Sequence, residues 1–456
     1  MRKLAVLNIV GLSNSIIGKN TPFIKSRIEQ GALSYIKPAF PAVTCSAQTT
    51  YLTGKSPDEH GIVGNGWYFK DECEIKFWKQ SDKLVKTPRI WDVVRKEHPE
   101  FTCANLFWWY NMYSSADFSA TPRPQYPADG RKIPDIYTQP AGLRDKLQKA
   151  LGTFPLFNFW GPKAGIKSSR WIAESAIYVD RLYKSDLSLV YLPHLDYCLQ
   201  KFGPDEENIS KELKEIDDLV QYLTTYFEQH GTDVLILSEY GISPVDRPVA
   251  INRVLREKGL ITVREEQGRE LLDAGASKAF AVADHQVAHV YVNDNSVKDE
   301  VKQLLANIEG VGDVLAGDER MKYNCIHDRA GDFIVVADSR SWFTYYYWLD
   351  DDHAPDFART VDIHRKPGYD PVEMFIDPDL KFPTLEVASK LAKKKMGFRS
   401  LMDVIPLKPE LVKGSHGRIP EDQKYYPVVI SSQKEHLSEK MVSAESIFDI
   451  ILKHLQ

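Results

Sequence analysis

Short runs of apolar residues recur along the chain, and a polar or glycine-containing loop follows each of them. The runs "LAVLNIV" (4–10), "LSLVYL" (187–192) and "DVLIL" (233–237) are apolar at almost every position, which is typical of strands buried on both faces of a parallel sheet. Amphipathic stretches with helical spacing lie between them, as at 169–185 and 209–231. This alternation predicts an α/β fold with a mostly parallel sheet flanked by helices.

Two regions depart from this alternation. Residues 107–140 are rich in proline, tyrosine and tryptophan, and we expect them to form a long ordered loop or lid. Residues 247–340 contain an apolar stretch, an amphipathic helix and a further apolar stretch, which predicts a small inserted α+β subdomain. The core is then divided into a first part, 1–246, and a segment 341–456 that carries an aromatic and acidic lid and returns to the core.

Composition and charge narrow the class of protein. The chain has 456 residues, of which 43% are hydrophobic and 27% charged, as in globular proteins. The net charge of -5 argues against a nucleic-acid polymer as partner. One basic cluster, "KLAKKKMG" near Lys390, has helical spacing, and we interpret it as a solvated helix face.

The cysteines and the N-terminus bear on location. Five scattered cysteines without a CxxC pair predict neither a disulfide framework nor a zinc finger, and they favour a reducing, cytoplasmic compartment. Leu4 to Val10 is too short an apolar run for a signal peptide, so we expect a first buried strand there. No apolar run reaches the roughly 20 residues of a membrane span, so we expect no membrane insertion.

The segment "PAFPAVTCSAQTTYLTG" (38–54) places two candidate nucleophiles side by side, Thr44 and Cys45. Either side chain suits covalent catalysis. The alternative is purely structural, because threonine caps helices well and Gly54 would end the helix that follows. The segment alone leaves these interpretations open.

Three further candidates lie at or after the predicted strand ends. In an open α/β sheet, ligands bind outside the carboxyl ends of the strands. Asp196 follows the strand 187–192, Glu239 follows 233–237, and His416 lies in the later segment "GSHG". Carboxylates and an imidazole suit a divalent metal such as zinc. Each residue also has an ordinary alternative as a helix cap, an ion-pair partner or part of a polar turn.

The order of these motifs resembles the nucleotide pyrophosphatase/phosphodiesterase branch of the alkaline phosphatase superfamily, and phosphonoacetate hydrolase as a further relative. That branch has a threonine nucleophile before a helix, then Thr-Gly, Pro-x-x-His-Gly-Ile and an asparagine, which match Thr44 and "LTGKSPDEHGIVGN" ending at Asn65. Asp196 in "YLPHLDYCLQKFGP" and His416 in "GSHGRIP" match later family motifs. The match runs from residue 1 to about residue 435.

The resemblance implies an alkaline-phosphatase-like core and a metal-dependent hydrolase of phosphoester bonds, of phosphodiester, pyrophosphate or phosphonate type. Thr44 would be the nucleophile, and Asn65 would stabilise the phosphoryl oxygens. Asp196, His416 and Glu239 would bind the divalent metal, with zinc the expected ion and a small phosphorylated molecule the expected substrate.

Three positions depart from the family pattern. Where the family has an aspartate and two histidines, this chain has Val10, Gln200 and Tyr240. Valine cannot ligate a metal, and glutamine and tyrosine are poor zinc ligands. We therefore expect one ion rather than two. The alternative hypothesis is a non-catalytic descendant that binds a phosphorylated ligand or a protein partner.

Replacement ligands are available elsewhere in the sequence. His364 lies in an aromatic and acidic stretch, 342–375, and His285 lies in "ADHQVAH". We predict that the stretch 342–375 covers the site. The alternative is that its aromatic residues only roof the site while its acids pair with Arg359 and Arg365.

Overall fold

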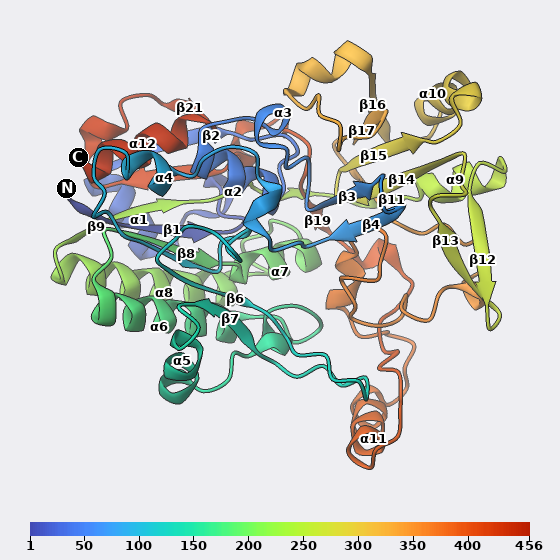
Figure 1. Cartoon of the computed structure of the whole chain (residues 1–456), viewed down its shortest axis with the longest axis horizontal. Helices are drawn as coiled ribbons and strands as arrows, with labels where there is room; N and C mark the ends of the chain where they lie inside the picture. Colours follow the sequence, from blue (N-terminus) through green and yellow to red (C-terminus); the bar gives the residue numbers. More distant parts are fainter.

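A nine-stranded sheet forms the centre of the larger part of the molecule, and a four-stranded sheet lies beside it (Figure 1). The computed structural model describes residues 1–456 except for the side chain at position 394. The large sheet has the strand order β21 (Met441–Ser443), β2 (Ala32–Lys37), β20 (Val428–Ser431), β9 (Thr232–Leu237), β1 (Lys3–Ile9), β8 (Leu187–Leu192), β5 (Cys103–Leu106), β6 (Phe118–Pro122) and β7 (Ile136–Gln139).

The middle of this sheet is parallel. β1 pairs with β8 on one side and with β9 on the other, and β8 continues to β5 and β6 in the same direction. All six residues of β8 and six of the seven in β1 are buried, as expected for strands covered on both faces. The predicted α/β class and mostly parallel sheet are confirmed.

Helices cover both faces of the large sheet. Figure 1 shows α6 and α8 below it and α2 and α12 above it. The amphipathic stretches predicted in the sequence form α6 and α8. The helices of this part are α1 (Pro22–Gln30), α2 (Thr44–Thr53), α3 (Pro57–His60), α4 (Ile90–Val94), α5 (Leu143–Leu151), α6 (Ile166–Tyr183), α7 (His194–Phe202), α8 (Ser210–Gln229) and α12 (Ser446–Leu455).

The second sheet has the order β14 (Ala279–Asp284), β15 (Val287–Val292), β17 (Phe333–Ala337) and β16 (Val311–Ala316), and all its pairs are antiparallel. The apolar stretch at 279–292 folds back on itself, because His285 takes the left-handed conformation with φ 60 between β14 and β15. Around this sheet lie α9 (Ile251–Glu257), α10 (Lys298–Ala306), β11 (Arg247–Val249), β12 (Thr262–Glu266), β13 (Arg269–Asp273) and β18 (Ser341–Phe343).

The remaining elements connect the two parts or lie at their edges. β3 (Gly66–Phe69) and β4 (Glu74–Phe77) form a hairpin, and β10 (Ser243–Pro244) pairs with β19 (Gly414–Ser415). α11 (Pro383–Lys395) projects from the body at the lower end of the view in Figure 1. Among the described residues, no helix combines the length and apolar character that a bilayer span requires.

Two predicted loops contain more structure than their composition suggested. Within 107–140, the short strands β6 and β7 extend the edge of the large sheet. Within 342–375, residues 345–348 are buried in the core beside the second sheet, while Asp350 to His353 are exposed. Proline and aromatic content therefore indicated ordered segments but not their pairing partners.

Candidate functional site

Thr44 is the first residue of α2, at the edge of the sheet where β1 and β9 end. The preceding Val43 is extended, with φ -131 and ψ 160, and the helix ends at Gly54, which takes the left-handed conformation. The Thr44 side chain is buried, with 3% exposure. The sequence therefore fixes one hydroxyl at a helix N-terminus, where the backbone N–H groups favour anions.

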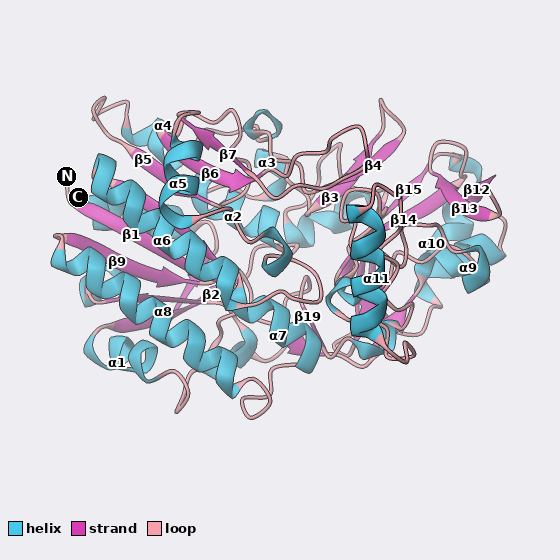
Figure 2. Ribbon diagram, turned by 90° about the horizontal axis from the view of Figure 1, so that it is seen from below, coloured by secondary structure: helices cyan, strands magenta, loops and turns pink.

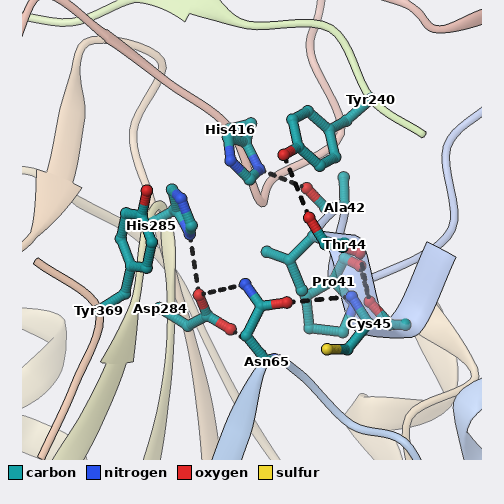
Figure 3. A network of polar contacts seen from close by, with 12 residues as sticks. Pro41, Ala42, Thr44, Cys45, Asn65, Tyr240, Asp284, His285, Tyr369 and His416 are labelled. Carbon is teal, nitrogen blue, oxygen red and sulfur yellow. Dashed lines mark hydrogen bonds and ion pairs between the residues drawn. The ribbon is translucent and has the colours of Figure 1, made fainter. Parts of the chain in front are cut away.

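A phenol links Thr44 to Asp196. The Tyr240 hydroxyl lies 3.3 Å from Thr44 Oγ1 and donates a hydrogen bond to Asp196 Oδ1 at 3.1 Å. The Tyr240 ring stacks on the imidazole of His416, with centroids 3.6 Å apart and planes 7° apart. Thr44, Tyr240 and Asp196 thus form a continuous chain of hydrogen bonds (Figure 3 shows the Thr44–Tyr240 contact).

Asp196 lies in the first turn of α7 and also accepts a hydrogen bond from Gln200, one helical turn further along. Gln200 Nε2 donates to Asp196 Oδ2 at 2.8 Å, and the Tyr369 hydroxyl donates to Gln200 Oε1 at 3.0 Å. Burial raises the pKa of Asp196 to about 7, although the hydrogen bonds from Tyr240 and Gln200 oppose the rise. The carboxyl therefore changes its protonation state near neutral pH.

Glu239, directly after β9, is held in a similar way. Asn8 Nδ2 donates to Glu239 Oε1 at 2.6 Å, and Gln48 Nε2 donates to the same oxygen. Burial raises the pKa of Glu239 to about 8, against the hydrogen bonds from Gln48 and Asn8. Both oxygens of Asp196 and Oε1 of Glu239 thus accept from neutral donors, namely amides and a phenol, whereas Oε2 of Glu239 is buried without a hydrogen-bond partner.

The turn of the β14–β15 hairpin forms the opposite wall of the site (Figure 3). Asp284 accepts from the Asn65 backbone N–H at 2.8 Å and from Asn65 Nδ2 at 3.1 Å, and His285 Nδ1 lies 2.8 Å from Asp284. Asn65 Oδ1 in turn accepts from the backbone N–H of Cys45 at 3.0 Å. Asn65 therefore ties the start of α2 to the second sheet.

Four aromatic rings run across the site in one stack. Tyr240 stacks on His416, His416 lies 3.7 Å from His285, and His285 lies 3.6 Å from Tyr369, each distance measured between centroids. Burial lowers the pKa of both histidines well below the usual value. The imidazoles are thus neutral members of a packed stack, and His416 Nδ1 is 2.7 Å from the Ala42 carbonyl oxygen.

The structure brings most of the predicted residues together, but it leaves others outside. Thr44, Asn65, Asp196, Glu239, His285 and His416 lie within the network described above. His364 is exposed, and its charged neighbours are Lys132, Asp362 and Lys79. Arg365 pairs with Asp356 at 2.9 Å, in line with the alternative that acids of this stretch form ion pairs.

Several members of the network were not singled out in the sequence. Asn8 and Gln48 are polar residues inside an apolar strand and a helix, and their burial is the signal that marks them. Asp284 and Tyr369 are buried as well, and Tyr369 belongs to the stretch predicted to cover the site. Apart from the neighbouring pair Asp284 and His285, their partners lie between 61 and 231 residues away along the chain, so sequence spacing gave no indication of the contacts.

Comparisons with known proteins agree with the motifs. A family model described as type I phosphodiesterase / nucleotide pyrophosphatase matches residues 4–370. An ectonucleotide pyrophosphatase/phosphodiesterase of Caenorhabditis elegans is 22% identical over 373 residues, which are 78% of this chain and 38% of the relative. The chain spans between 34% and 41% of the length of the first three curated relatives that it matches.

Solved structures share the fold. Murine ectonucleotide pyrophosphatase/phosphodiesterase 5, solved as an inactive variant in complex with AMP, has a TM-score of 0.60 at 13% identity, over 100% of this chain and 95% of that chain. Phosphonoacetate hydrolase from Sinorhizobium meliloti 1021, in complex with phosphonoacetate, has a TM-score of 0.62 at 13% identity, over 100% and 96%.

The side chains present do not fit the divalent metal that the motifs implied. Val10 has no lone pair, and the Tyr240 hydroxyl lies between Thr44 and Asp196, in contact with both. The Gln200 amide occupies the other oxygen of Asp196. Within the described part of the chain, no three or more His, Cys, Asp or Glu side chains are arranged to hold an ion.

His285 and His416 do not complete this set of metal ligands. The Nε2 atoms of His285 and His416 are buried without a hydrogen-bond partner. Their rings are tilted by 38° at a centroid distance of 3.7 Å, and neither imidazole belongs to a group of three or more His, Cys, Asp or Glu side chains that could hold an ion in the described part of the chain. Asp196, His416, Glu239, His285 and His364 thus do not form the predicted metal site in this arrangement.

Because three side chains prevent this site from holding a divalent metal, replacing them should create zinc binding. Val10→Asp combined with Gln200→His and Tyr240→His restores the family's residue types and removes the phenol from between Thr44 and Asp196. We expect the triple variant to retain zinc after desalting and to gain thermal stability when zinc is added. Elemental analysis and melting curves with and without zinc measure both. Tyr226→His, outside the site, is the control for an added histidine, and zinc retained by the wild-type protein would contradict the misfit.

A second prediction concerns pH and Glu239. The pKa of Glu239 is about 8 in the folded state and about 4.3 in an unfolded chain. Between these two pH values the folded state keeps a proton on Glu239 that the unfolded state releases. The free energy of unfolding therefore falls as pH rises, by about 1.4 kcal/mol per pH unit from this group.

Glu239→Gln keeps a neutral side chain that accepts from Asn8 and Gln48, and it removes this proton. We expect its free energy of unfolding, measured by denaturant titration at pH 5.5 and 7.5, to fall less than that of the wild-type protein. Glu309→Gln, at an exposed position, should follow the wild type. Parallel behaviour of all three proteins would show that Glu239 does not titrate in this window.

Proposed function

Because the chain belongs to the type I phosphodiesterase / nucleotide pyrophosphatase family, we propose that it hydrolyses a phosphoester bond in a small phosphorylated molecule, with Thr44 as the nucleophile. The observation that carries this proposal is the hydrogen-bonded chain from Thr44 through Tyr240 to Asp196. It connects a hydroxyl at a helix N-terminus to a carboxyl with a pKa of about 7, which suits a general base at neutral pH.

The chemistry follows from this chain of contacts. Thr44 Oγ1 attacks phosphorus, and the bond from phosphorus to the leaving oxygen breaks. The Thr44 proton passes to the Tyr240 oxygen while the Tyr240 proton passes to Asp196, and the leaving oxygen is protonated by solvent. Water then attacks the phosphothreonine and the bond from phosphorus to Thr44 Oγ1 breaks. The proton returns from Asp196 through Tyr240 to Thr44 Oγ1, while water releases one proton to solvent and the phosphate retains the other.

Asn65 supports the phosphoryl group through α2, and its amide keeps a second N–H as a donor for a phosphoryl oxygen, because Nδ2 makes one hydrogen bond, to Asp284. Both ends of the Asn65 side chain are engaged, one with Asp284 and the other with the Cys45 backbone. Asn65 therefore positions the first turn of α2, whose N-terminus favours anionic phosphoryl oxygens.

A second candidate function is binding without catalysis. The observation that favours it is the tight closure of the site, since Thr44, Tyr240 and Asp196 are all at most 7% exposed and Val10 replaces a charged residue type of the family. In that case the site, or a surface beside it, would hold a phosphorylated ligand or a protein partner.

Hydrolysis of bis(p-nitrophenyl) phosphate and p-nitrophenyl phosphate separates the two. Thr44→Ala removes the hydroxyl that forms the covalent intermediate, so we expect activity to fall at least about 10³-fold. Cys45→Ala should retain most activity, because its neighbouring side chain points about 100° away around the helix. Loss in Cys45→Ala with retention in Thr44→Ala would assign the nucleophile to Cys45.

Wild-type protein without activity, with EDTA or with added zinc, manganese or magnesium, would favour the binding function. Stabilisation of such a protein by AMP or inorganic phosphate in melting curves would then support a phosphorylated ligand.

Tyr240→Phe tests the proton path separately from the nucleophile. Phenylalanine keeps a ring to stack on His416 and removes the hydroxyl that links Thr44 to Asp196. We expect kcat to fall about 10²-fold with little change in KM, measured over pH 5 to 9. Tyr226→Phe removes a hydroxyl that donates to Asp180 outside the site and should leave both values unchanged. An active Tyr240→Phe would refute the proton path while leaving Thr44 as nucleophile.

A further inference from the structure

α11 projects from the body of the protein in Figure 1 and lies in front in Figure 2, where the molecule is seen from below. Val387 lies against a small cluster of buried residues that includes Trp342 and Val372. Lys390 pairs with Glu386 at 3.1 Å and also with Asp403. This inner face is thus held by a few apolar contacts and ion pairs.

The opposite face of α11 is apolar and exposed. We call the residues of this face the outer stripe: Phe382, Leu385, Ala388, Ala392 and Met396. Steps of three and four residues place all five on one side of a helix, and backbone bonds from Glu386 to Phe382 and from Met396 to Ala392 continue the helical pattern at both ends. Phe382, Leu385 and Met396 are 68%, 66% and 67% exposed.

Large apolar side chains continue beyond the stripe. Phe398 is 64% exposed and Leu401 is 49% exposed. The loop at 123–133 lies near this end. Its residue Asp129 has a lowered pKa, mainly because of hydrogen bonds from Arg131 and also because the charge of Arg399 is close. Tyr126 in that loop is 55% exposed. A contiguous apolar face of this kind on a protein surface marks an interaction site.

The charge of the segment is opposite to that of the whole chain. Residues 381–399 contain six basic residues and one acidic residue, whereas the chain carries a net charge of -5. Lys393 and Lys395 are exposed and flank the outer stripe on its two sides, as their positions on the helix require. Lysines at such edges extend their charged ends away from an apolar surface that they border.

These features select among the possible partners. A second copy of the chain would bring Lys393 and Lys395 near their own counterparts, and the stripe is a single face of a helix of 13 residues, small beside the roughly 800 Å² per partner of a stable interface. A nucleic acid would meet the lysines but leave the apolar stripe in water. A bilayer with anionic headgroups matches both, since it accepts apolar side chains and attracts basic ones.

We propose that α11 docks the protein on an anionic phospholipid surface, with the outer stripe and Phe398 at the boundary of headgroups and acyl chains and with Lys393 and Lys395 at the lipid phosphates. This is peripheral binding by one helix face and involves no membrane span. It is independent of the chemistry proposed for Thr44, since α11 takes no part in that network.

Sedimentation of the full chain with lipid vesicles tests the proposal. Wild-type protein should sediment with vesicles of phosphatidylcholine containing phosphatidylserine at about 0.1 M salt, and much less with pure phosphatidylcholine. The variant Phe382→Ser, Leu385→Ser, Met396→Ser should bind at least about tenfold more weakly. Lys393→Ala with Lys395→Ala should bind about thirtyfold more weakly, because each lysine near such a surface contributes about a factor of five.

The control exchanges apolar side chains of similar exposure elsewhere. Phe157→Ser with Met321→Ser, at positions 56% and 59% exposed, should bind vesicles like the wild type, and melting curves verify that every variant is folded. The proposal is overturned if wild-type protein binds vesicles equally with and without phosphatidylserine, or if the control loses binding as the stripe variant does. It is also overturned if light scattering shows a dimer that the stripe variant abolishes. Binding of single-stranded RNA that exceeds vesicle binding would overturn it as well.

Discussion

Two carboxyl groups, Asp196 and Glu239, are buried at the same edge of the large sheet, and the surrounding structure is organised around satisfying them. A buried carboxylate without partners is costly, and in many sites of this type a cation compensates it. Here the compensation comes from amides and a phenol, which belong to different elements: Asn8 in β1, Gln48 in α2, Gln200 in α7 and Tyr240 after β9. Each of these elements must therefore keep its place for the carboxyls to stay buried.

This arrangement changes the chemistry available at the edge. Burial disfavours the charged forms of both carboxyls and raises their pKa values into the neutral range, and the hydrogen bonds from neutral donors oppose this rise without cancelling it. A site of this kind handles protons through hydrogen-bonded side chains. The contact of Thr44 with Tyr240 joins the candidate nucleophile to the same network, so that burial, protonation and reactivity depend on one set of contacts.

The site also joins the two sheets of the molecule. Thr44 and Asp196 come from helices of the large sheet, whereas Asp284 and His285 come from the hairpin turn of the small one. Asn65 makes hydrogen bonds to both sides, and the ring stack from Tyr240 to Tyr369 crosses between them. A change in the position of the small sheet relative to the large one would therefore change the surroundings of Thr44.

The sequence by itself determined the α/β class, the main strands and helices, and the candidates Thr44, Asp196, Glu239 and His416, because burial on both faces and strand-end position are local properties. It also identified Val10 as a residue that cannot ligate a metal. Only the tertiary structure decided what replaces the metal ligands. The partners of Glu239 lie 191 and 231 residues away along the chain, and no local pattern encodes such pairings. The same holds for α11, whose basic spacing predicted a solvated helix face, while the packing of Val387 and Lys390 decided that the apolar side chains face outward.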